Sequence, residues 1–299
     1  MEKRFNNLNL KYLITDHLTW MDTNCVGSFF KKKNLPVLLC SHGMIDLNDN
    51  KYEKNELLSL ANGLCYSKYA STIIAQTPMT NEVSNKFLEH HNYNIIKAHP
   101  IAYNGQRLEK NPDRKKINIL FAGTYKVFLS RPYIYQGSFE FMQTIKKILL
   151  IFRNLKNVNI VFNIRTNDEI DNFFLKKLVD KDLNIKMIFN GNIEALMQNS
   201  QLLITNFSTL IDEYSYLSRP VVILNDYLKF ECYKHFYLHQ NEKEFLKPIY
   251  YLNSEECNIE IINILEKIRK NVKISKPRHI WSSEEAMNNQ TLLKTINEY

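Results

Sequence analysis

Short apolar runs alternate with segments of helical spacing along most of this chain, and this alternation constrains the fold more than any other feature. Val37–Cys40, Thr72–Ala75 and Ile117–Ala122 have the length of buried strands, whereas Phe139–Leu155 has the spacing of a long amphipathic helix. Strands that alternate with helices form parallel sheets with helices on their faces. The sequence therefore predicts an α/β fold with two doubly wound, Rossmann-like parallel-sheet domains.

The chain has 299 residues, which is room for two domains. A polar stretch at 105–116 contains Pro112 and predicts a linker. We expect a short N-terminal domain at 1–112 and a second domain at 113–299, with the last helix packing back on the first domain. Strands are expected near 11–15, 37–40, 72–75, 95–98, 117–122, 159–164, 186–189, 202–204 and 221–224, and helices near 56–66, 81–90, 139–155, 193–198 and 259–270 and from 208 and 283.

The net charge of +8 comes from 39 basic and 31 acidic residues, and it suits a phosphate-bearing ligand or an anionic surface. Zinc-finger spacing and RNA-binding signatures do not occur, so we expect no nucleic-acid partner. The five cysteines form no CxxC pair, which favours reduced thiols. Without an apolar run of membrane-spanning length, the sequence predicts a cytoplasmic protein with peripheral contact to the inner membrane.

The segment after the run Leu202–Ile204 carries the strongest functional signal. Ser208 and Thr209 follow a short turn and open a helical pattern, so their hydroxyls and the free N–H groups of the helix start could bind an anion. Glu213 lies one turn on and leans back toward the helix start, where a carboxylate could accept hydrogen bonds from a ribose. The alternative is a helix cap, because Ser and Thr followed by an acid also form capping signals.

Two other predicted strands end in residues suited to phosphate. Gly123, Thr124 and Lys126 follow the strand at 117–122 and offer close backbone approach, a hydroxyl and a positive charge. Arg165 leaves the strand at 159–164 and could bind a phosphate through two hydrogen bonds. The alternatives are an ordinary turn with a solvated Lys126, and an Arg165 that pairs with the acids after it. Carboxyl ends of parallel strands share one crevice, so the three signals reinforce each other.

His42 is the candidate base. It follows the strand at 37–40 within Ser41-His-Gly43, where a neutral imidazole could take a proton from an acceptor hydroxyl and Gly43 allows a sharp turn. The alternative is a structural histidine. No HExxH pattern or spaced acidic cluster indicates a metal, so the expected chemistry is metal-independent.

These residues resemble a known family. Leu203–Tyr214, followed by Ser218–Ile223, resembles the C-terminal part of GT-B transferases, most closely the CDP-glycerol:poly(glycerophosphate) glycerophosphotransferase group and related capsule and lipopolysaccharide glycosyltransferases. Ile119–Lys126 looks like the family's "ILyaPTwR" strand and loop, and Ser41-His-Gly43 resembles its "(W/S)HG" motif. The resemblance implies that Ser208 and Thr209 bind donor phosphate, Glu213 the ribose, and His42 acts as the base.

The resemblance has departures. Asn206 stands where the family usually has Asp, and at the family's "lKPHP" motif Arg165 replaces the Lys while Asn167 falls where the His would be. If the family's His stabilises the departing phosphate, Arg165 would have to do so here. About forty residues precede His42, fewer than a GT-B N-terminal domain usually has, so a short or truncated acceptor-side domain is expected.

The leading hypothesis is a metal-independent GT-B transferase without a cofactor. It would move a sugar or polyol-phosphate from a CDP-, CMP- or UDP-linked donor to a glycan or lipid-linked glycan acceptor of capsule, teichoic-acid-like polymer or lipopolysaccharide. A nucleotide-sugar epimerase is the second hypothesis; the sequence lacks the additional acids expected for its proton transfers. A truncated, non-catalytic transferase that binds nucleotide or scaffolds a complex is the third. Absence of binding to CDP, UDP and CMP would exclude both enzyme hypotheses, and hydrolysis or transfer of the donor would exclude the third.

Overall fold

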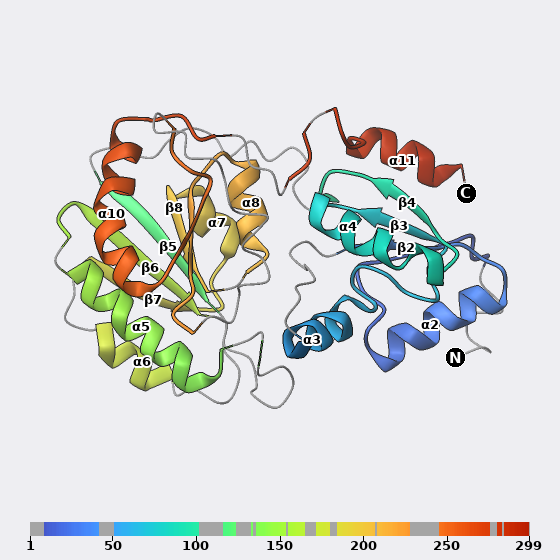
Figure 1. Ribbon diagram of the computed structural model, residues 1–299, viewed down its shortest axis with the longest axis horizontal. Helices are drawn as coiled ribbons and strands as arrows, with labels where there is room; N and C mark the ends of the chain where they lie inside the picture. The colour runs from blue at the N-terminus through green and yellow to red at the C-terminus, as the bar shows by residue number, and fades with distance from the viewer. Residues whose placement is uncertain are drawn as a thin grey trace. The chain divides into compact units, whose positions relative to one another are not determined.

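The computed structural model divides the chain into two compact units. Unit 1 comprises Met1–Gln106 with Arg278–Tyr299, and unit 2 comprises Arg107–Pro277. Each unit is an α/β structure built on one parallel sheet (Figure 1). The residues described by the structure are 9–41, 51–101, 116–123, 133, 136–153, 155–164, 172–179, 184–206, 208–227, 245–275, 280–282 and 284–298.

Unit 1 has a four-stranded parallel sheet whose described strands are ordered β1-β2-β3-β4, as they occur in the sequence. A doubly wound sheet would reverse this order at one point, and the described part of unit 1 does not. The elements are β1 (Leu13–Thr15), α2 (Met21–Lys32), β2 (Val37–Cys40), α3 (Lys51–Ala61), β3 (Thr72–Ala75), α4 (Pro78–Lys86), the 3-10 helix η1 (Leu88–His90), β4 (Asn94–Lys97) and α11 (Asn289–Asn297).

Helix α11 covers one face of the sheet of unit 1. Leu38 of β2 and Ile74 of β3 point to the same face of the sheet, where they form a buried cluster with Leu292 and Ile296 of α11. Right-handed crossovers between strands in sequence order place the connecting helices on a single face, so the opposite face needs a helix from elsewhere in the chain. Figure 1 shows α11 on one side of this sheet and α2 and α3 on the other. The indole N–H of Trp281 also donates to the carbonyl of Ala75 at 3.0 Å.

Unit 2 has a six-stranded parallel sheet in the order β10-β9-β8-β5-β6-β7. The chain runs outward from β5 to β7, returns to β8 beside β5, and runs outward again to β10. This is a doubly wound sheet, as predicted, and its order reverses between β5 and β8. The elements are β5 (Ile117–Gly123), α5 (Ser138–Arg153), β6 (Val158–Ile164), α6 (Asn172–Val179), β7 (Ile185–Phe189), α7 (Ile193–Gln198), β8 (Leu202–Thr205), α8 (Leu210–Tyr216), β9 (Val221–Leu224), β10 (Ile249–Leu252) and α10 (Ser254–Arg269).

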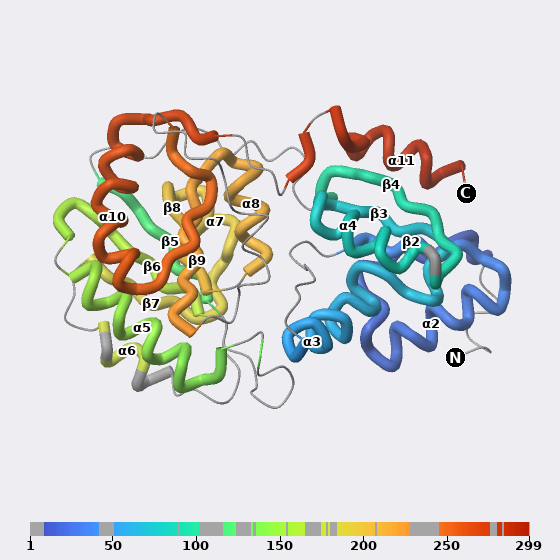
Figure 2. Tube along the Cα trace, in the orientation of Figure 1, coloured from blue at the N-terminus to red at the C-terminus, as the bar shows by residue number. Residues whose placement is uncertain are grey.

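The larger core of unit 2 lies between the sheet and the helices α5, α6 and α10. Phe121 of β5 and Phe162 of β6 belong to it, with Phe141 of α5 and Ile261 of α10. Successive side chains of a strand point to opposite faces, so Leu120 and Leu203 lie on the other face of the sheet. The helices α7 and α8 lie on that side. The trace in Figure 2 shows β9 beside β8 in this unit, in agreement with their pairing. Both sheet faces are therefore apolar, which explains the continuous apolar runs of the central strands.

The predicted strands are confirmed, but the limits of four helices were wrong. The helix expected at 259–270 begins at Ser254, behind a capping box made by Asn253 and Glu256. The helix expected at 56–66 begins at Lys51 and ends at Ala61, because the chain turns at Gly63, whose φ is +87°. The helix expected from 81 begins at Pro78, behind a capping box made by Thr77 and Thr80. The helix expected from 283 begins at Asn289. The predicted linker lies mostly outside the described residues.

Three elements were not predicted: α2, α6 and β10. Gly27 and Cys25 interrupt the apolar spacing of α2, yet Gly27 suits the packing because a Cβ there would lie 3.0 Å from the Leu18 side chain. β10 is an edge strand of four residues, Ile249–Leu252, and its Ile and Tyr residues favour a strand, so this signal was present in the sequence and was overlooked. In the part of the chain that the structure describes, no helix is both long and apolar enough to cross a membrane.

Candidate functional site

A cavity of about 360 Å³ opens at the carboxyl ends of the central strands of unit 2. It lies where the strand order reverses between β5 and β8, the position at which open parallel sheets bind ligands. Its walls come from the ends of β5 and β6 and from the segments that follow β7 and β8. The lining residues are Ala122, Gly123, Asn163, Asn190, Gly191, Ile193, Ser208 and Leu210.

Ser208 brings a hydroxyl to this cavity from the turn between β8 and α8. Its Oγ accepts a hydrogen bond from the N–H of Leu210 at 3.2 Å, which leaves its O–H able to donate to a ligand. Thr209 is exposed and is the N-cap residue of α8, but its side chain makes no capping hydrogen bond. The local cap is therefore made by Ser208, and the Thr209 hydroxyl is not used to cap the helix.

Gly123 ends β5 at the cavity wall, and the core beneath it requires a glycine. A Cβ at this position would lie 2.7 Å from ring carbons of both Phe121 and Phe141. These rings belong to the buried core of unit 2 and have no open space into which they could move. The sequence predicted Gly123 from ligand approach, and the structure adds this packing reason.

Asn163 and Gly191 form a second wall that the sequence analysis did not identify. The Asn163 Oδ1 atom accepts a hydrogen bond from the backbone N–H of Gly191 at 2.9 Å. The bond joins the ends of the neighbouring strands β6 and β7, whose pairing places Asn163 opposite Ile188. An available signal was a polar side chain next to the end of the strand Val158–Ile164, whose other polar residue, Asn159, lies near its start.

The first turn of α8 carries two adjacent acids in different environments. Asp212 is only 4% exposed, whereas Glu213 is half-buried. Burial, and to a lesser degree the charge of Glu213, raises the pKa of Asp212 to about 8. Thr209 and Glu213 are close in sequence to the lining residues Ser208 and Leu210, but they do not line the cavity themselves. The described walls of the cavity therefore contain no charged side chain.

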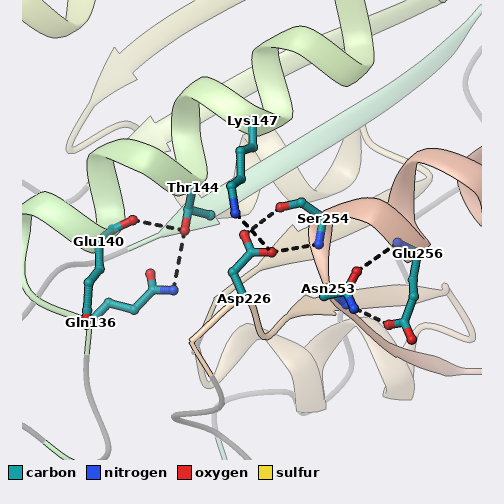
Figure 3. A network of polar contacts seen from close by, with 8 residues as sticks. All are labelled: Gln136, Glu140, Thr144, Lys147, Asp226, Asn253, Ser254 and Glu256. Carbon is teal, nitrogen blue, oxygen red and sulfur yellow. Dashed lines mark hydrogen bonds and ion pairs between the residues drawn. The ribbon is translucent and has the colours of Figure 1, made fainter.

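A directional chain of hydrogen bonds holds the end of β8 against α5. Asn206 Nδ2 donates to Gln136 Oε1 at 3.0 Å, Gln136 Nε2 donates to Thr144 Oγ1 at 3.4 Å, and Thr144 donates to the carbonyl of Glu140 at 3.1 Å. Figure 3 shows the part of this chain from Gln136 to Glu140. The only proton of the Thr144 hydroxyl goes to Glu140, so Gln136 must turn its carbonyl toward position 206. A donor at 206 fits this arrangement, which gives a reason for Asn in place of the family's Asp.

A second polar contact joins the end of β9 to the start of α10. The buried carboxylate of Asp226 accepts hydrogen bonds from the N–H and the hydroxyl of Ser254, at 2.7 and 2.5 Å, and lies 3.6 Å from Lys147 Nζ (Figure 3). A carboxylate at a helix start is stabilised by the free N–H groups there. Arg219, part of the predicted family motif, donates to the carbonyls of Met197 and Ser200, so it supports the fold behind β8.

The structure brings together Gly123 and Ser208 among the predicted site residues, with Thr209 and Glu213 adjacent on α8. His42, Thr124, Lys126 and Arg165 lie outside the described residues. Within the described part, no group of three or more His, Cys, Asp or Glu side chains is placed to hold a metal ion.

Positive charge is concentrated in unit 2. This unit contains 26 Lys and Arg residues against 19 Asp and Glu residues, a net +7 of the +8 carried by the whole chain. The remaining 13 basic and 12 acidic residues belong to unit 1 and nearly cancel. The unit with the switch-point cavity therefore has the field that attracts an anionic ligand.

Comparison with known proteins finds similarity in structure only. No protein-family model matches the sequence, and no curated protein matches it. The Methanocaldococcus jannaschii UDP-GlcNAc 2-epimerase in complex with UDP-GlcNAc and UDP has a TM-score of 0.64 at 13% identity, covering 100% of this chain and 78% of that one. The Neisseria meningitidis UDP-GlcNAc 2-epimerase bound to UDP-GlcNAc scores 0.57 at 14% identity, covering 96% and 76%.

A variant of the wall teichoic acid polymerase TagF scores 0.50 at 16% identity, covering 96% of this chain and 71% of that one. At such identities the similarity establishes the fold alone. The chain is an α/β protein of the GT-B type, with two Rossmann-like units, and the fold class predicted from the sequence is confirmed.

Proposed function

We propose that this chain is an enzyme that uses a nucleotide-activated donor, and that the cavity of unit 2 binds the nucleotide. The observation that carries the proposal is the position of the cavity, at the switch point of a doubly wound sheet, with Gly123 and Ser208 in its wall. The net charge of unit 2 favours the phosphates of such a donor. Two structural neighbours, both epimerases, contain UDP-GlcNAc, which supports a nucleotide-sugar ligand.

The proposed reaction is transfer of a sugar or polyol-phosphate to a surface glycan acceptor. Ser208 and Thr209 would donate hydrogen bonds to the phosphates and Glu213 would accept them from the ribose. Thr124, Lys126 and Arg165 would neutralise charge on the leaving nucleotide, which stabilises the transition state. His42 would take the proton of the acceptor hydroxyl. The resemblance in sequence and the TagF similarity support this reaction.

Epimerisation of a nucleotide sugar is the second candidate. It is favoured by the TM-scores, which are higher for the two UDP-GlcNAc 2-epimerases than for TagF. Epimerisation needs no acceptor, and it changes the sugar of the donor itself. The two reactions therefore differ in a product that can be measured directly.

Calorimetric titration with UDP, CDP and CMP tests the shared part of the proposal. We expect at least one of them to bind, and a ligand at 100 times its Kd to stabilise the protein by about 2.7 kcal/mol. Absence of binding by all three would overturn the proposal. Incubating UDP- and CDP-linked donors with and without a glycan acceptor separates the reactions, because an altered sugar without acceptor indicates epimerisation. A His42→Ala variant is the control for transfer, expected to bind nucleotide normally and to lose turnover.

A further inference from the structure

Asn163 holds a fixed position in the cavity wall. It is the penultimate residue of β6, it is half-buried, and its Oδ1 accepts the N–H of Gly191 at 2.9 Å. Gly191 also lines the cavity. A Cβ on Gly191 would lie 3.1 Å from Asn163 Oδ1 and 2.7 Å from the Ile188 side chain, so a glycine permits this close contact. The amide of Asn163 is thus held by the backbone of the neighbouring strand end.

The bond to Gly191 determines which way the amide faces. A backbone N–H is only a donor, so the atom facing it must be the carbonyl oxygen Oδ1. The Nδ2 group then points away from Gly191 with two N–H donors. Among the described residues, this group has no hydrogen-bond partner. A donor held at a cavity wall without a protein partner is available to a ligand.

The Ser208 hydroxyl in the described wall has the same character. It already accepts from Leu210, so it retains its proton for donation. Asn190 adds a second amide, which can donate or accept, whereas Ala122, Gly123, Ile193 and Leu210 present no polar side-chain atom. Because the described wall offers donors and no carboxylate, it suits a ligand rich in acceptor oxygens. A nucleoside diphosphate has such oxygens on its phosphates and on a carbonyl-bearing base.

We propose that Asn163 is a ligand-binding residue whose Nδ2 donates a hydrogen bond to an oxygen atom of the bound nucleotide. The oxygen belongs either to a phosphoryl group or to a carbonyl of the base. Gly191 positions the amide through its N–H and does not itself need to contact the ligand. This inference rests on the proposed function, in which the cavity holds the nucleotide.

The Asn163→Asp variant isolates the donor. An Asp keeps an oxygen for the Gly191 N–H, but it replaces Nδ2 by a negatively charged acceptor that repels the ligand oxygen. We expect calorimetry to show a loss of affinity for UDP of tenfold or more, because a buried hydrogen bond is lost and an unmatched charge is added. Asn163→Ala should lose less, since it removes the donor without adding charge. Asn184→Asp, the same substitution at an exposed position before β7, should bind UDP like the unmodified protein.

The outcomes separate this inference from the function on which it rests. If the unmodified protein binds none of UDP, CDP and CMP, the proposed function fails. If it binds UDP and either folded Asn163 variant binds UDP equally well, the role of Asn163 is overturned and the proposed function stands. Titrating the unmodified protein and Asn163→Ala with pyrophosphate and with uridine then identifies the oxygen that Asn163 binds. Affinity lost for pyrophosphate assigns a phosphoryl oxygen, and affinity lost for uridine assigns a base carbonyl.

Discussion

Asp212 is the residue whose environment departs most from what its sequence position suggests. In the sequence it is one acid among the residues after a Ser-Thr pair, yet in the structure it is buried beside the half-buried Glu213. Its pKa of about 8 means that it is mostly protonated at neutral pH in the folded protein. Glu213, the proposed ribose-binding residue, therefore lies next to a neutral neighbour rather than a second charge.

The raised pKa of Asp212 predicts a pH dependence of stability. In the unfolded chain this carboxyl ionises near pH 4, while in the folded protein it ionises near pH 8. Below pH 4 the carboxyl is neutral in both states and does not lower the free energy of unfolding. As the pH rises from about 4 to about 8, the unfolded chain releases the proton first, so the free energy of unfolding falls. An Asp212→Asn variant does not titrate, so its advantage over the unmodified protein should grow over this range, by a few kcal/mol.

Urea unfolding followed by circular dichroism at pH 5 and pH 8 measures this difference. We expect the unfolding free energy of Asp212→Asn to exceed that of the unmodified protein more at pH 8 than at pH 5. An equal difference at both pH values would show that Asp212 is not buried as a neutral acid.

At the scale of elements, the junction between β8 and α5 depends on the direction of its hydrogen bonds. An Asn206→Asp variant would place an acceptor against the Gln136 carbonyl at a position that is only 1% exposed. Gln136 can turn its amide only if Thr144 gives up its bond to Glu140, and the new carboxylate would still be desolvated. We expect a loss of about 1–3 kcal/mol in unfolding free energy.

Denaturant unfolding of Asn206→Asp at pH 7 gives this number, and Asn184→Asp is its matched control because the same change is made at an exposed residue. The control should stay within about 0.5 kcal/mol of the unmodified protein. If both variants were equally stable, the hydrogen-bond direction at Gln136 would not constrain position 206.

The elements also show what the sequence could predict. Central strands such as β2 and β9 were located to the residue, because both of their faces are buried and their runs are continuously apolar. The helix α2 has a weak pattern, since tertiary contacts such as that of Gly27 with Leu18 support it, whereas β10 is short and its strand-favouring residues were overlooked. In the site, Ser208 and Gly123 were found from their residue types at strand ends. Asn163 was not, because its role depends on a bond to Gly191 across two strands.

At the scale of the whole molecule, unit 1 is formed by two segments far apart in the sequence, whereas unit 2 is continuous. The two tryptophans of the chain, Trp20 and Trp281, both belong to unit 1, and Trp281 is buried against Ala75. Tryptophan emission therefore reports on unit 1, and nucleotide binding, as proposed above, reports on unit 2. A substitution in unit 1 therefore tests whether nucleotide binding depends on that unit.

Helix α11 offers a matched pair of substitutions that tests this dependence. Leu292 is 2% exposed and belongs to the cluster on the sheet of unit 1, whereas its neighbour Leu293 is 58% exposed. Leu292→Asp buries a charge in an apolar cluster, so we expect α11 to leave the sheet and Trp281 emission to shift to the red at a lower urea concentration. The free energy of unfolding should fall by at least about 2–5 kcal/mol, the cost of truncating a buried Leu. Leu293→Asp, with the same charge at an exposed position of the same helix, should unfold like the unmodified protein. Both variants should bind UDP with unchanged affinity if the cavity of unit 2 is the nucleotide site, because neither substitution lies in unit 2. A loss of UDP binding in Leu292→Asp alone would instead show that nucleotide binding needs a folded unit 1.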